Sequence, residues 1–238
     1  MAVGYNPRIV TDGLVLALDA GNTKSYPGSG TTWTDLSGND NDGTLTNSPT
    51  YNSNNGGSFA FDGTNDHVSF ASASELQFLN RLPYTLEVWM YPTSNPGANT
   101  WTGIFNREDS SVGSRDGYNI YLNGSASNTF YLATERFCTG TATGVGYTYN
   151  DSDLLNIWHH VVATYDGTTL RLYRNGVQIN SGTSTGNVTN TSKTLEIGRR
   201  GGGSYFNGRL NGQKVYNKAL SVSEISQNFN ALRGRFGI

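Results

Sequence analysis

The sequence predicts an all-β fold: a single antiparallel β-sandwich with one short C-terminal helix. Among its 238 residues are 30 Gly and 14 Tyr, and only 14% are charged, a composition typical of strands joined by tight turns. The stretch 158–176, WHHVVATYDGTTLRLYRNG, holds two strand-like runs with an Asp-Gly and an Asn-Gly turn. Because these dipeptides supply the positive φ angles of short hairpins, the stretch predicts a meander.

Strand signals recur along the chain without a linker, so we predict one domain over residues 1–238. It has an N-terminal arm at 1–12 and a C-terminal tail at 233–238. Apolar or alternating runs predict the strands, which in chain order are 13–20, 58–61, 67–70, 84–91, 104–106, 118–122, 129–134, 159–165, 169–174, 195–198 and 209–216. Residues 31–47 are expected to form a turn-rich connection, and the strands that flank FDGTND (61–66) to form a hairpin.

The C-terminal segment carries the one convincing helix signal, over 222–232. Ser221 and Glu224 have the spacing of a capping box, and Gly234 is a stop signal. The apolar residues that recur at helical spacing are Ile225, Phe229 and Leu232. We expect this face to seal an open end of the sandwich, and we expect Trp33, Trp89 and Trp158 to lie in the core.

Charge is unevenly distributed along the chain. The net charge is −2, which does not indicate a nucleic-acid partner. Residues 193–238 nevertheless carry a net charge of +6, which leaves −8 for the remainder. Either the two parts pair within one fold, or a basic face or tail docks on an acidic partner. Cys138 is the sole cysteine, so no intrachain disulfide can form.

The N-terminus lacks the apolar core of a signal peptide, and no run approaches transmembrane length. We therefore expect synthesis in a cytoplasm without export by the general secretory route, and no membrane insertion.

Four phrases resemble, in order, the pattern of laminin-G-like domains in the concanavalin A-like lectin/glucanase superfamily. They are FDGTNDHVSF (61–70), YTLEVWMYP (84–92), NIWHHVVATYDGTTLRLYRNG (156–176) and YFNGRLNGQKVYNKALSVSEI (205–225). The resemblance spans most of the chain and implies a jelly-roll β-sandwich. It implies architecture and not activity, because such sandwiches usually bind or build and only some subfamilies catalyse.

The two ends of the chain look like virion structural proteins of tailed bacteriophages. The stretches that carry this likeness are GLVLALDAGNTKSYPGSGTTWTDLSGNDNDGTL (13–45) and ALSVSEISQNFNALRGRFGI (219–238). It implies a capsid-decoration, neck or tail-appendage protein, made in the host cytoplasm and located in the virion. Its partners would be other virion proteins and host-surface glycans, with a homo-oligomer as one arrangement. The alternative location is extracellular.

The sequence does not indicate an enzyme. Glycosidases on this kind of sandwich use clustered carboxylates, because an acid and a nucleophile must flank one glycosidic bond. No glutamate lies in such a cluster, and Glu87 is interpreted as a polar position on a sheet face. His159 and His160 point to opposite faces of a strand and cannot form a joint metal site. Assembly of a carboxylate pair across strands stays open.

Calcium is the one cofactor that the sequence suggests, and none is required. Asp62 and Asp66 bracket the turn Gly63-Thr64-Asn65, and related sandwiches often carry calcium at a rim. The alternative is a turn stabilised by its Asp side chains. The segment 39–43, NDNDG, is interpreted as a turn.

Two loops carry the residue types that bind sugars, namely aromatic rings that stack on apolar sugar faces and planar polar groups that bind hydroxyls. Around the loop 93–117 these are Trp101, Arg107, Asp109, Arg115 and Tyr118. Around the Gly-rich loop 198–204 they are Arg199, Arg200, Tyr205 and Phe206. Either group would be a carbohydrate or partner site; the alternative is exposed loop decoration or contact with a protein.

The leading hypothesis is therefore a non-enzymatic virion structural protein that acts by binding. The residues expected to dock on other subunits are those of the tail: Arg233, Arg235, Phe236 and Ile238. The second hypothesis is a calcium-dependent carbohydrate-binding module. The third, a glycan hydrolase or lyase, requires a carboxylate or His/Tyr cluster in one groove.

Overall fold

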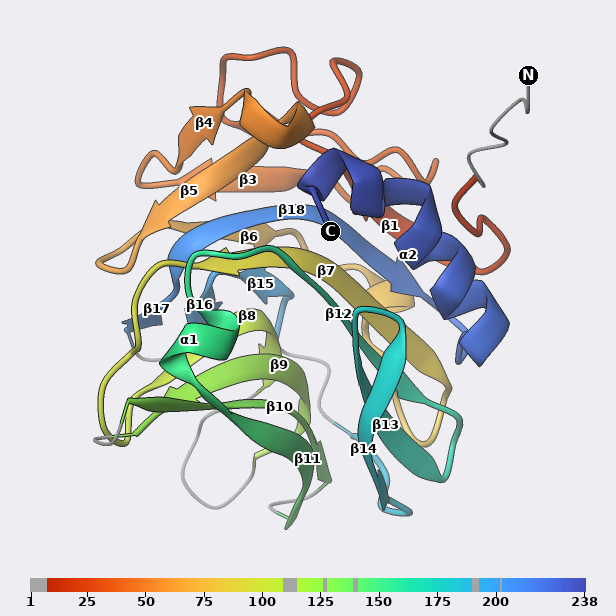
Figure 1. Cartoon of the computed structure of the whole chain (residues 1–238). Coiled ribbons are helices and arrows are strands. Elements are labelled where there is room, and N and C mark those ends of the chain that lie inside the picture. The colour runs from red at the N-terminus through yellow and green to blue at the C-terminus, as the bar shows by residue number, and fades with distance from the viewer. Residues whose placement is uncertain (1–7, 109–114, 126–127, 139–140, 190–192, 202) are drawn as a thin grey trace, which may run out of the picture.

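The computed structural model describes residues 8–108, 115–125, 128–138, 141–189, 193–201 and 203–238. Two antiparallel sheets pack face to face (Figure 1), which confirms the predicted sandwich. The first sheet runs in the order β14 (Val177–Thr183), β13 (Thr169–Arg174), β12 (His159–Tyr165), β7 (Tyr84–Pro92), β18 (Asn207–Tyr216), β5 (Ser58–Asp62) and β4 (Thr50–Asn52), with β1 (Leu14–Leu18) paired to β18.

The second sheet runs in the order β11 (Thr141–Asn150), β10 (Thr129–Cys138), β9 (Gly117–Gly124), β8 (Trp101–Glu108), β15 (Glu196–Ile197), β6 (His67–Phe70), β3 (Gly43–Thr46) and β2 (Thr32–Trp33). A separate hairpin is formed by β16 (Arg199–Arg200) and β17 (Ser204–Tyr205). The helical elements are α1 (Asp151–Leu154), α2 (Val222–Phe236) and the 3-10 turns Asn54–Gly56 and Ser74–Leu76. No described helix is long and apolar enough to cross a membrane.

Alternation along the strands separates the core from two outer faces. On β7, Leu86 and Val88 point between the sheets into the core. Glu87 and Trp89 point to the opposite face, because successive side chains of a strand alternate. The three tryptophans expected in the core, Trp33, Trp89 and Trp158, are all buried, at 0%, 0% and 5% exposed. Trp33 lies in the core between the sheets, whereas Trp89 and Trp158 form a separate cluster with Phe236 of the C-terminal helix.

The predicted meander is also confirmed. β12 pairs with β13 across the Asp166-Gly167 turn, and β13 pairs with β14 across the Asn175-Gly176 turn. Gly167 and Gly176 have φ values of +96° and +80°, the conformation that makes glycine favourable at these positions.

The predicted hairpin around FDGTND is wrong. β5 belongs to the first sheet and β6 to the second, so residues 62–67 carry the chain from one layer to the other. Asp62 Oδ1 accepts hydrogen bonds from the amides of Thr64 and Asn65, and Asp66 Oδ2 accepts one from the Asp62 amide. These bonds stabilise a turn that leads Phe61 and Val68 into the same core from opposite sheets.

Several strands lie in segments with little strand signal in the sequence. β2 and β3 fall inside the predicted connection 31–47, and β11 and β14 were not predicted. β11 reads TATGVGYTYN, and β14 reads VQINSGT. Their glycines and many polar residues weaken the strand pattern, and pairing with neighbouring strands overrides that weak local preference.

The C-terminal helix begins as predicted and ends later. Ser221 and Glu224 form the capping box, but α2 continues through Gly234 to Phe236. Gly237, with a φ of +75°, is its C-cap. Gly234 is tolerated because a glycine inside a helix costs only about 1 kcal/mol.

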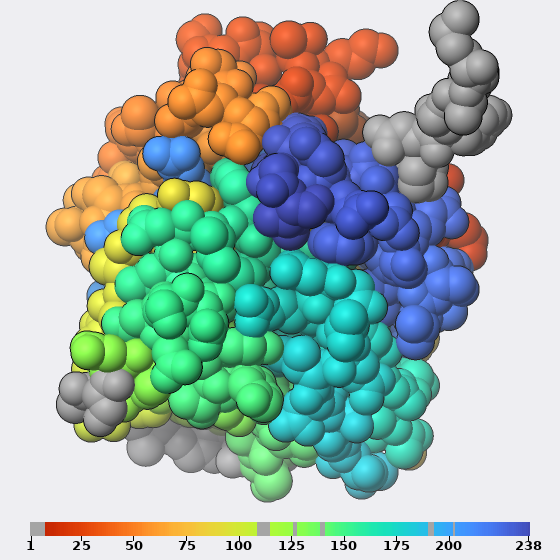
Figure 2. Space-filling model, viewed as in Figure 1, coloured from red at the N-terminus to blue at the C-terminus, as the bar shows by residue number. Residues whose placement is uncertain are grey.

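α2 does not seal an end of the sandwich, as expected from the sequence, but covers the outer face of the first sheet. Phe229 and Phe236 stack on Trp89, with ring centroids 5.9 and 4.3 Å apart. In Figure 2 the dark blue helix is packed between the orange N-terminal segment and the cyan strands. We call this helix-covered surface the sealed face.

The expected docking tail is part of the same packing. Phe236 is 3% exposed and lies 4.7 Å from the Trp158 ring. Arg235 forms two hydrogen bonds with Asp19, at 2.7 and 2.9 Å. The guanidinium of Arg233 lies 5.8 Å from the Phe229 ring centre, and only Ile238, which is 39% exposed, follows the helix cap. Residues 233–236 therefore belong to α2 and not to a separate tail; docking on another subunit through the exposed Arg233 and Ile238 stays a prediction.

The uneven charge is resolved within the fold. Cations of the basic C-terminal segment pair with acids from the rest of the chain: Arg200 with Glu108 and Glu135, Lys214 with Glu87, Lys218 with Asp12, and Arg235 with Asp19. These pairs favour the first interpretation of the charge distribution over a basic docking surface.

Candidate functional site

The hairpin β16–β17 lies against the outer face of the second sheet, directly over Gly103 of β8. A Cβ atom at Gly103 would lie only 2.3 Å from the Arg199 carbonyl oxygen. Gly198, at the base of the hairpin, donates its amide to the Ile104 carbonyl at 3.1 Å and accepts from the Phe206 amide at 2.9 Å. A glycine at 103 thus lets the hairpin backbone approach β8.

This approach brings Arg200 onto two carboxylates from different strands. Arg200 Nε and Nη2 lie 3.1 and 3.2 Å from the two oxygens of Glu108, and Nη2 is also 3.2 Å from Glu135 Oε2. The Glu108 side chain is 1% exposed, that of Arg200 8% and that of Glu135 17%. A guanidinium suits this arrangement because its planar donors can serve two carboxylates at once.

Two residues of β9 donate hydrogen bonds to the carboxylates and so orient them. Asn119 Nδ2 donates to Glu108 Oε2 at 2.6 Å, and the Tyr121 hydroxyl donates to Glu135 Oε1 at 3.0 Å. Burial raises the pKa of Tyr121, and the neighbouring Glu135 charge raises it further. The phenol therefore stays protonated and remains a donor. The guanidinium of Arg200 lies 4.8 Å from the Tyr121 ring centre.

A hollow of about 310 Å³ opens beside this cluster. We call it the hairpin site; its lining residues are Trp101, Glu108, Arg115, Glu135, Arg200, Gly201 and Ser204. Trp101 is 40% exposed, and Arg115 is held by a cation–π contact of 5.3 Å with Phe137. The hollow thus combines an aromatic surface with charged, planar hydrogen-bonding groups.

The structure unites parts of the two predicted groups. Trp101 and Arg115, from the first group, and Arg200, from the second, line one hollow. Tyr205 and Phe206 line a second hollow on the other side of the hairpin, and Arg199 lines a third. Asp109 lies outside the described residues.

Two residues predicted for the site face the interior instead. Tyr118 is fully buried in the core, where its hydroxyl donates to the Leu76 carbonyl at 2.5 Å. Arg107 is 2% exposed, and its Nη1 donates to the Gln77 carbonyl at 3.3 Å. Both are corrected as surface binding residues because the strand alternation turns them away from the outer face.

Four residues of the site were not predicted from the sequence: the carboxylates Glu108 and Glu135, and Asn119 and Tyr121, which donate hydrogen bonds to them. The polar residues Asn119 and Tyr121 alternate with the core residues Tyr118, Ile120 and Leu122 along β9, a period-two signal that indicates one polar face. The cross-strand pairing of Asn119 with Glu135, and of Asn106 with Asn119, could not be read from the sequence.

The turn proposed for calcium uses its carboxylates for backbone hydrogen bonds, as described above for Asp62 and Asp66. Within the described parts of the chain, no three His, Cys, Asp or Glu side chains are placed to hold one metal ion. The backbone amides lower the pKa of Asp62 and burial raises that of Asp66. This geometry favours a turn stabilised by its Asp side chains; calcium at this rim stays a prediction.

The model of the concanavalin A-like lectin/glucanases superfamily matches residues 62–226, which cover more than half of the chain. No curated protein sequence matches this chain.

Solved structures with a similar fold include binding domains of clostridial toxins. The binding domain of Paraclostridial Mosquitocidal Protein 1 has a TM-score of 0.72 at 20% identity, over 93% of this chain and 52% of that one. The botulinum neurotoxin serotype G binding domain has a TM-score of 0.72 at 14% identity, over 91% and 50%. The binding domain of botulinum neurotoxin DC, solved in complex with rat synaptotagmin II, has a TM-score of 0.70 at 18% identity, over 94% and 52%. The chain thus spans about half the length of these proteins, and the likeness establishes the fold alone.

Proposed function

Since the chain belongs to the concanavalin A-like lectin/glucanase superfamily, we propose that it is a non-enzymatic binding domain that takes a neutral glycan at the hairpin site. The observation that carries the proposal is the exposed Trp101 beside the triad Arg200, Glu108 and Glu135. Sugar rings stack on aromatic side chains through their apolar faces, while carboxylates and guanidinium groups bind their hydroxyls.

Charge balance favours a neutral ligand. Glu108 and Glu135 carry two negative charges, and Arg200 and Arg115 carry two positive ones around the same hollow. An anionic sugar would meet the carboxylates, and a cationic one the guanidinium groups. A hydroxyl can both donate to a carboxylate oxygen and accept from a guanidinium nitrogen, so the cluster complements vicinal hydroxyls.

Hydrolysis is the second candidate, because the structure does place two carboxylates in one hollow. A glycosidase acid must present a proton to the leaving-group oxygen. Here the oxygens of Glu108 and Glu135 accept hydrogen bonds from Arg200, and also from Asn119 and Tyr121. This arrangement supports binding over catalysis.

The experiment is a glycan array probed with the wild-type protein and with Trp101→Ala. We expect selective binding by the wild type and a loss of roughly tenfold to a hundredfold in affinity in the variant, the effect of removing one stacking platform. Val177→Ala, a change at an exposed apolar residue on the remote strand β14, is the matched control. Hydrolysis of the bound glycan would favour the second candidate, and the absence of any bound glycan would contradict both.

The proposed setting is the virion of a tailed bacteriophage, with assembly in the host cytoplasm and contact with other virion subunits. The similarity of the two chain ends to virion structural proteins supports it. Mass spectrometry and immunogold electron microscopy of purified particles test it; absence of the protein from particles would favour the extracellular alternative.

A further inference from the structure

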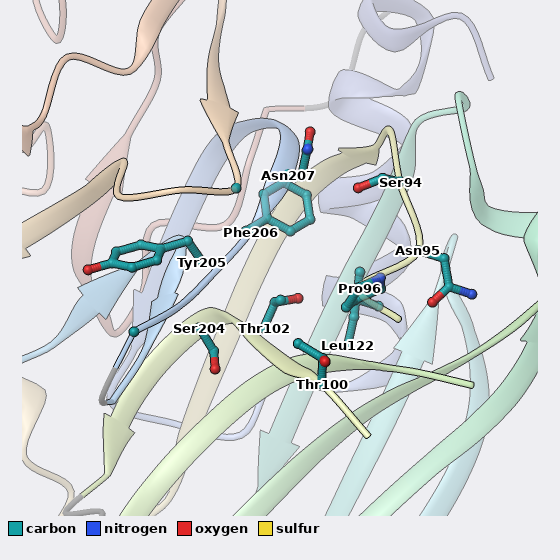
Figure 3. Close-up of a pocket in the computed structure, with 12 residues that line it drawn as sticks. Ser94, Asn95, Pro96, Thr100, Thr102, Leu122, Ser204, Tyr205, Phe206 and Asn207 are labelled. Carbon is teal, nitrogen blue, oxygen red and sulfur yellow. The ribbon is translucent and has the colours of Figure 1, made fainter. Parts of the chain in front are cut away.

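A second hollow, whose lining is drawn in Figure 3, lies on the far side of the hairpin from the hairpin site. Its volume is about 200 Å³, and Ser204 lines both hollows. Its walls come from the segment after β7, from β8 and β9, and from residues 203–207. Figure 3 shows Tyr205 and Phe206 on one side of it and Pro96 and Asn95 on the other.

The second hollow contains a polar group that the fold leaves unsatisfied. Thr102 is 5% exposed, and its hydroxyl has no hydrogen-bond partner among the described residues. Leaving a buried hydroxyl unpaired is unfavourable, and such groups in native proteins call for an explanation. A ligand hydroxyl in the hollow would supply the missing partner.

The remaining lining suits the mixed character of a sugar ring. Leu122, Phe206 and Pro96 give apolar surface, and Ser94, Ser204 and Asn207 give polar atoms around it. Among these, Phe206 is 1% exposed and packs on Phe61 from the opposite side, which fixes the position of the hollow's apolar wall.

A third hollow, of about 130 Å³, continues from the hairpin site in the other direction. Glu108 and Gly201 line both of these hollows. It too contains unsatisfied groups, since Asn106 Oδ1 and Arg199 Nε have no hydrogen-bond partner among the described residues. Asn106 is 3% exposed.

We propose that the ligand is a short neutral oligosaccharide that runs around the hairpin, with one sugar unit in each of the three hollows. The central unit stacks on Trp101, and a flanking unit hydrogen-bonds the Thr102 hydroxyl. Each hollow lies at or below the lower end of the 300–1,000 Å³ that whole small-molecule pockets occupy, so each fits a single unit. This inference rests on the proposed function, because it extends the same site.

The test is the chain-length dependence of binding, measured by calorimetry on the wild-type protein. The probes are the monosaccharide, disaccharide, trisaccharide and tetrasaccharide of the neutral sugar selected on the array. We expect the affinity to rise at least about tenfold from one unit to three, and then to level off at four, because the unit beyond the hollows finds no further contacts.

Thr102→Val then locates the flanking unit, because valine matches threonine in shape but lacks the hydroxyl. We expect a loss of roughly fivefold for the trisaccharide, the value of one hydrogen bond, and no change for the monosaccharide. Thr44→Val, at an exposed position of the remote strand β3, is the control, and thermal unfolding verifies that both variants fold.

The outcomes separate the two proposals. Equal affinity for all chain lengths, or a Thr102→Val effect that is the same at every length, overturns the oligosaccharide inference while the binding function stands. Failure of every sugar to bind overturns both. A rise with length that Trp101→Ala abolishes at every length, and that Thr102→Val removes only for longer chains, supports both.

Discussion

Each outer face of the sandwich carries a cluster of carboxylates paired with a cation, but one cluster is buried and the other borders a hollow that is open to solvent. On the sealed face, Glu87 pairs with Lys214 at 2.7 Å and accepts from Asn228 of α2 at 2.6 Å, and its side chain is 0% exposed. On the outer face of the second sheet, which we call the open face, Glu108 and Glu135 pair with Arg200 beside a solvent-facing hollow. The two clusters differ in what lies over them. Helix α2 buries the cluster of the sealed face, whereas the short hairpin β16–β17 leaves the cluster of the open face accessible to solvent.

A buried carboxylate–cation cluster therefore does not by itself indicate a binding site. The sealed cluster also holds groups unpaired among the described residues, Trp89 Nε1 and His160 Nδ1, but α2 covers it, and the Tyr216 hydroxyl accepts from Asn228 and donates to the Val10 carbonyl. The open cluster lies beside an exposed tryptophan and unsatisfied hydroxyl and amide groups. We therefore assign stability to the first cluster and binding to the second.

The largest expected effect comes from breaking the sealed cluster. Glu87→Gln leaves Lys214, which is 4% exposed, buried without its charge partner. We expect the free energy of unfolding to fall by about 3–5 kcal/mol, with glycan affinity unchanged in the folded fraction. Urea denaturation followed by circular dichroism measures the first quantity, and calorimetry the second. A stable variant with weakened binding would contradict the division of roles.

The same cluster gives a pH dependence with a defined sign. Burial opposes ionisation of Glu87, but the Lys214 charge and the hydrogen bonds from His160 and Lys214 outweigh it and lower the pKa of Glu87 to about 2, from 4.5. A lowered pKa contributes stability above the unfolded value, and this contribution, roughly 3 kcal/mol, is lost as the pH falls from about 5 towards 2. The stability difference between wild type and Glu87→Gln should narrow over this range; a constant difference would contradict the assignment.

The next largest effect is expected from displacing the hairpin β16–β17, which lies over the open face. Gly103→Ala places a methyl group against the Arg199 backbone, so the hairpin must shift away from β8. We expect a loss of about 1–3 kcal/mol in stability, as for other overpacked sites, and loss of measurable glycan binding because Arg200 moves off Glu108 and Glu135. Gly234→Ala, in α2 on the opposite outer face, where a Cβ would meet no atom within 4 Å, is the control, and it should leave glycan binding unchanged. Unchanged binding in Gly103→Ala would exclude the hairpin from the site.

The sequence was sufficient to predict the architecture, but not to predict which residues come together at the site. Alternating residues and the Asp-Gly and Asn-Gly turns predicted the sandwich and its meander, because local conformation and burial follow from such patterns. The site depends on the register between β8, β9 and β10, and a shift of one residue would turn every side chain to the other face. The fold-back of the hairpin over Gly103 is likewise a tertiary contact with no local signal.

Two predictions, that the C-terminal helix seals an end of the sandwich and that Glu87 is a polar position on a sheet face, failed for a related reason. The period of Ile225, Phe229 and Leu232 predicted an apolar helix face, but not the surface that it covers. That surface is made by Trp89, His160 and other outward residues of the first sheet. A predicted polar position such as Glu87 is consequently buried, because the helix that covers it is distant in sequence.

A smaller effect is expected from one carboxylate of the open cluster. Glu135→Gln keeps the shape of the side chain and leaves Arg200 paired with Glu108. We expect a stability change of roughly 1 kcal/mol or less, measured by thermal unfolding, with a several-fold loss of glycan affinity measured by calorimetry. A loss as large as that of Glu87→Gln would show that this cluster is structural too, and the contrast between the two faces would fail.

The smallest effect is expected from adding or removing calcium at the turn that contains Asp62 and Asp66. Because Asp62 and Asp66 already accept backbone hydrogen bonds, addition of calcium or a chelator should shift the midpoint of thermal unfolding by less than about 1 °C. Glycan binding should be equally insensitive. A calcium-dependent rise in the midpoint that Asp66→Ala removes would instead establish the ion at this turn.

Intrinsic tryptophan fluorescence tests the central claim most directly. Trp33, Trp89 and Trp158 are buried, whereas Trp101 is 40% exposed and lines the hairpin site. We predict that titration with the glycan selected on the array gives a saturable change in emission and protects Trp101 from iodide quenching. Both effects should be absent in Trp101→Phe. Saturable glycan binding that leaves the emission and quenching of Trp101 unchanged would place the site elsewhere and contradict the account.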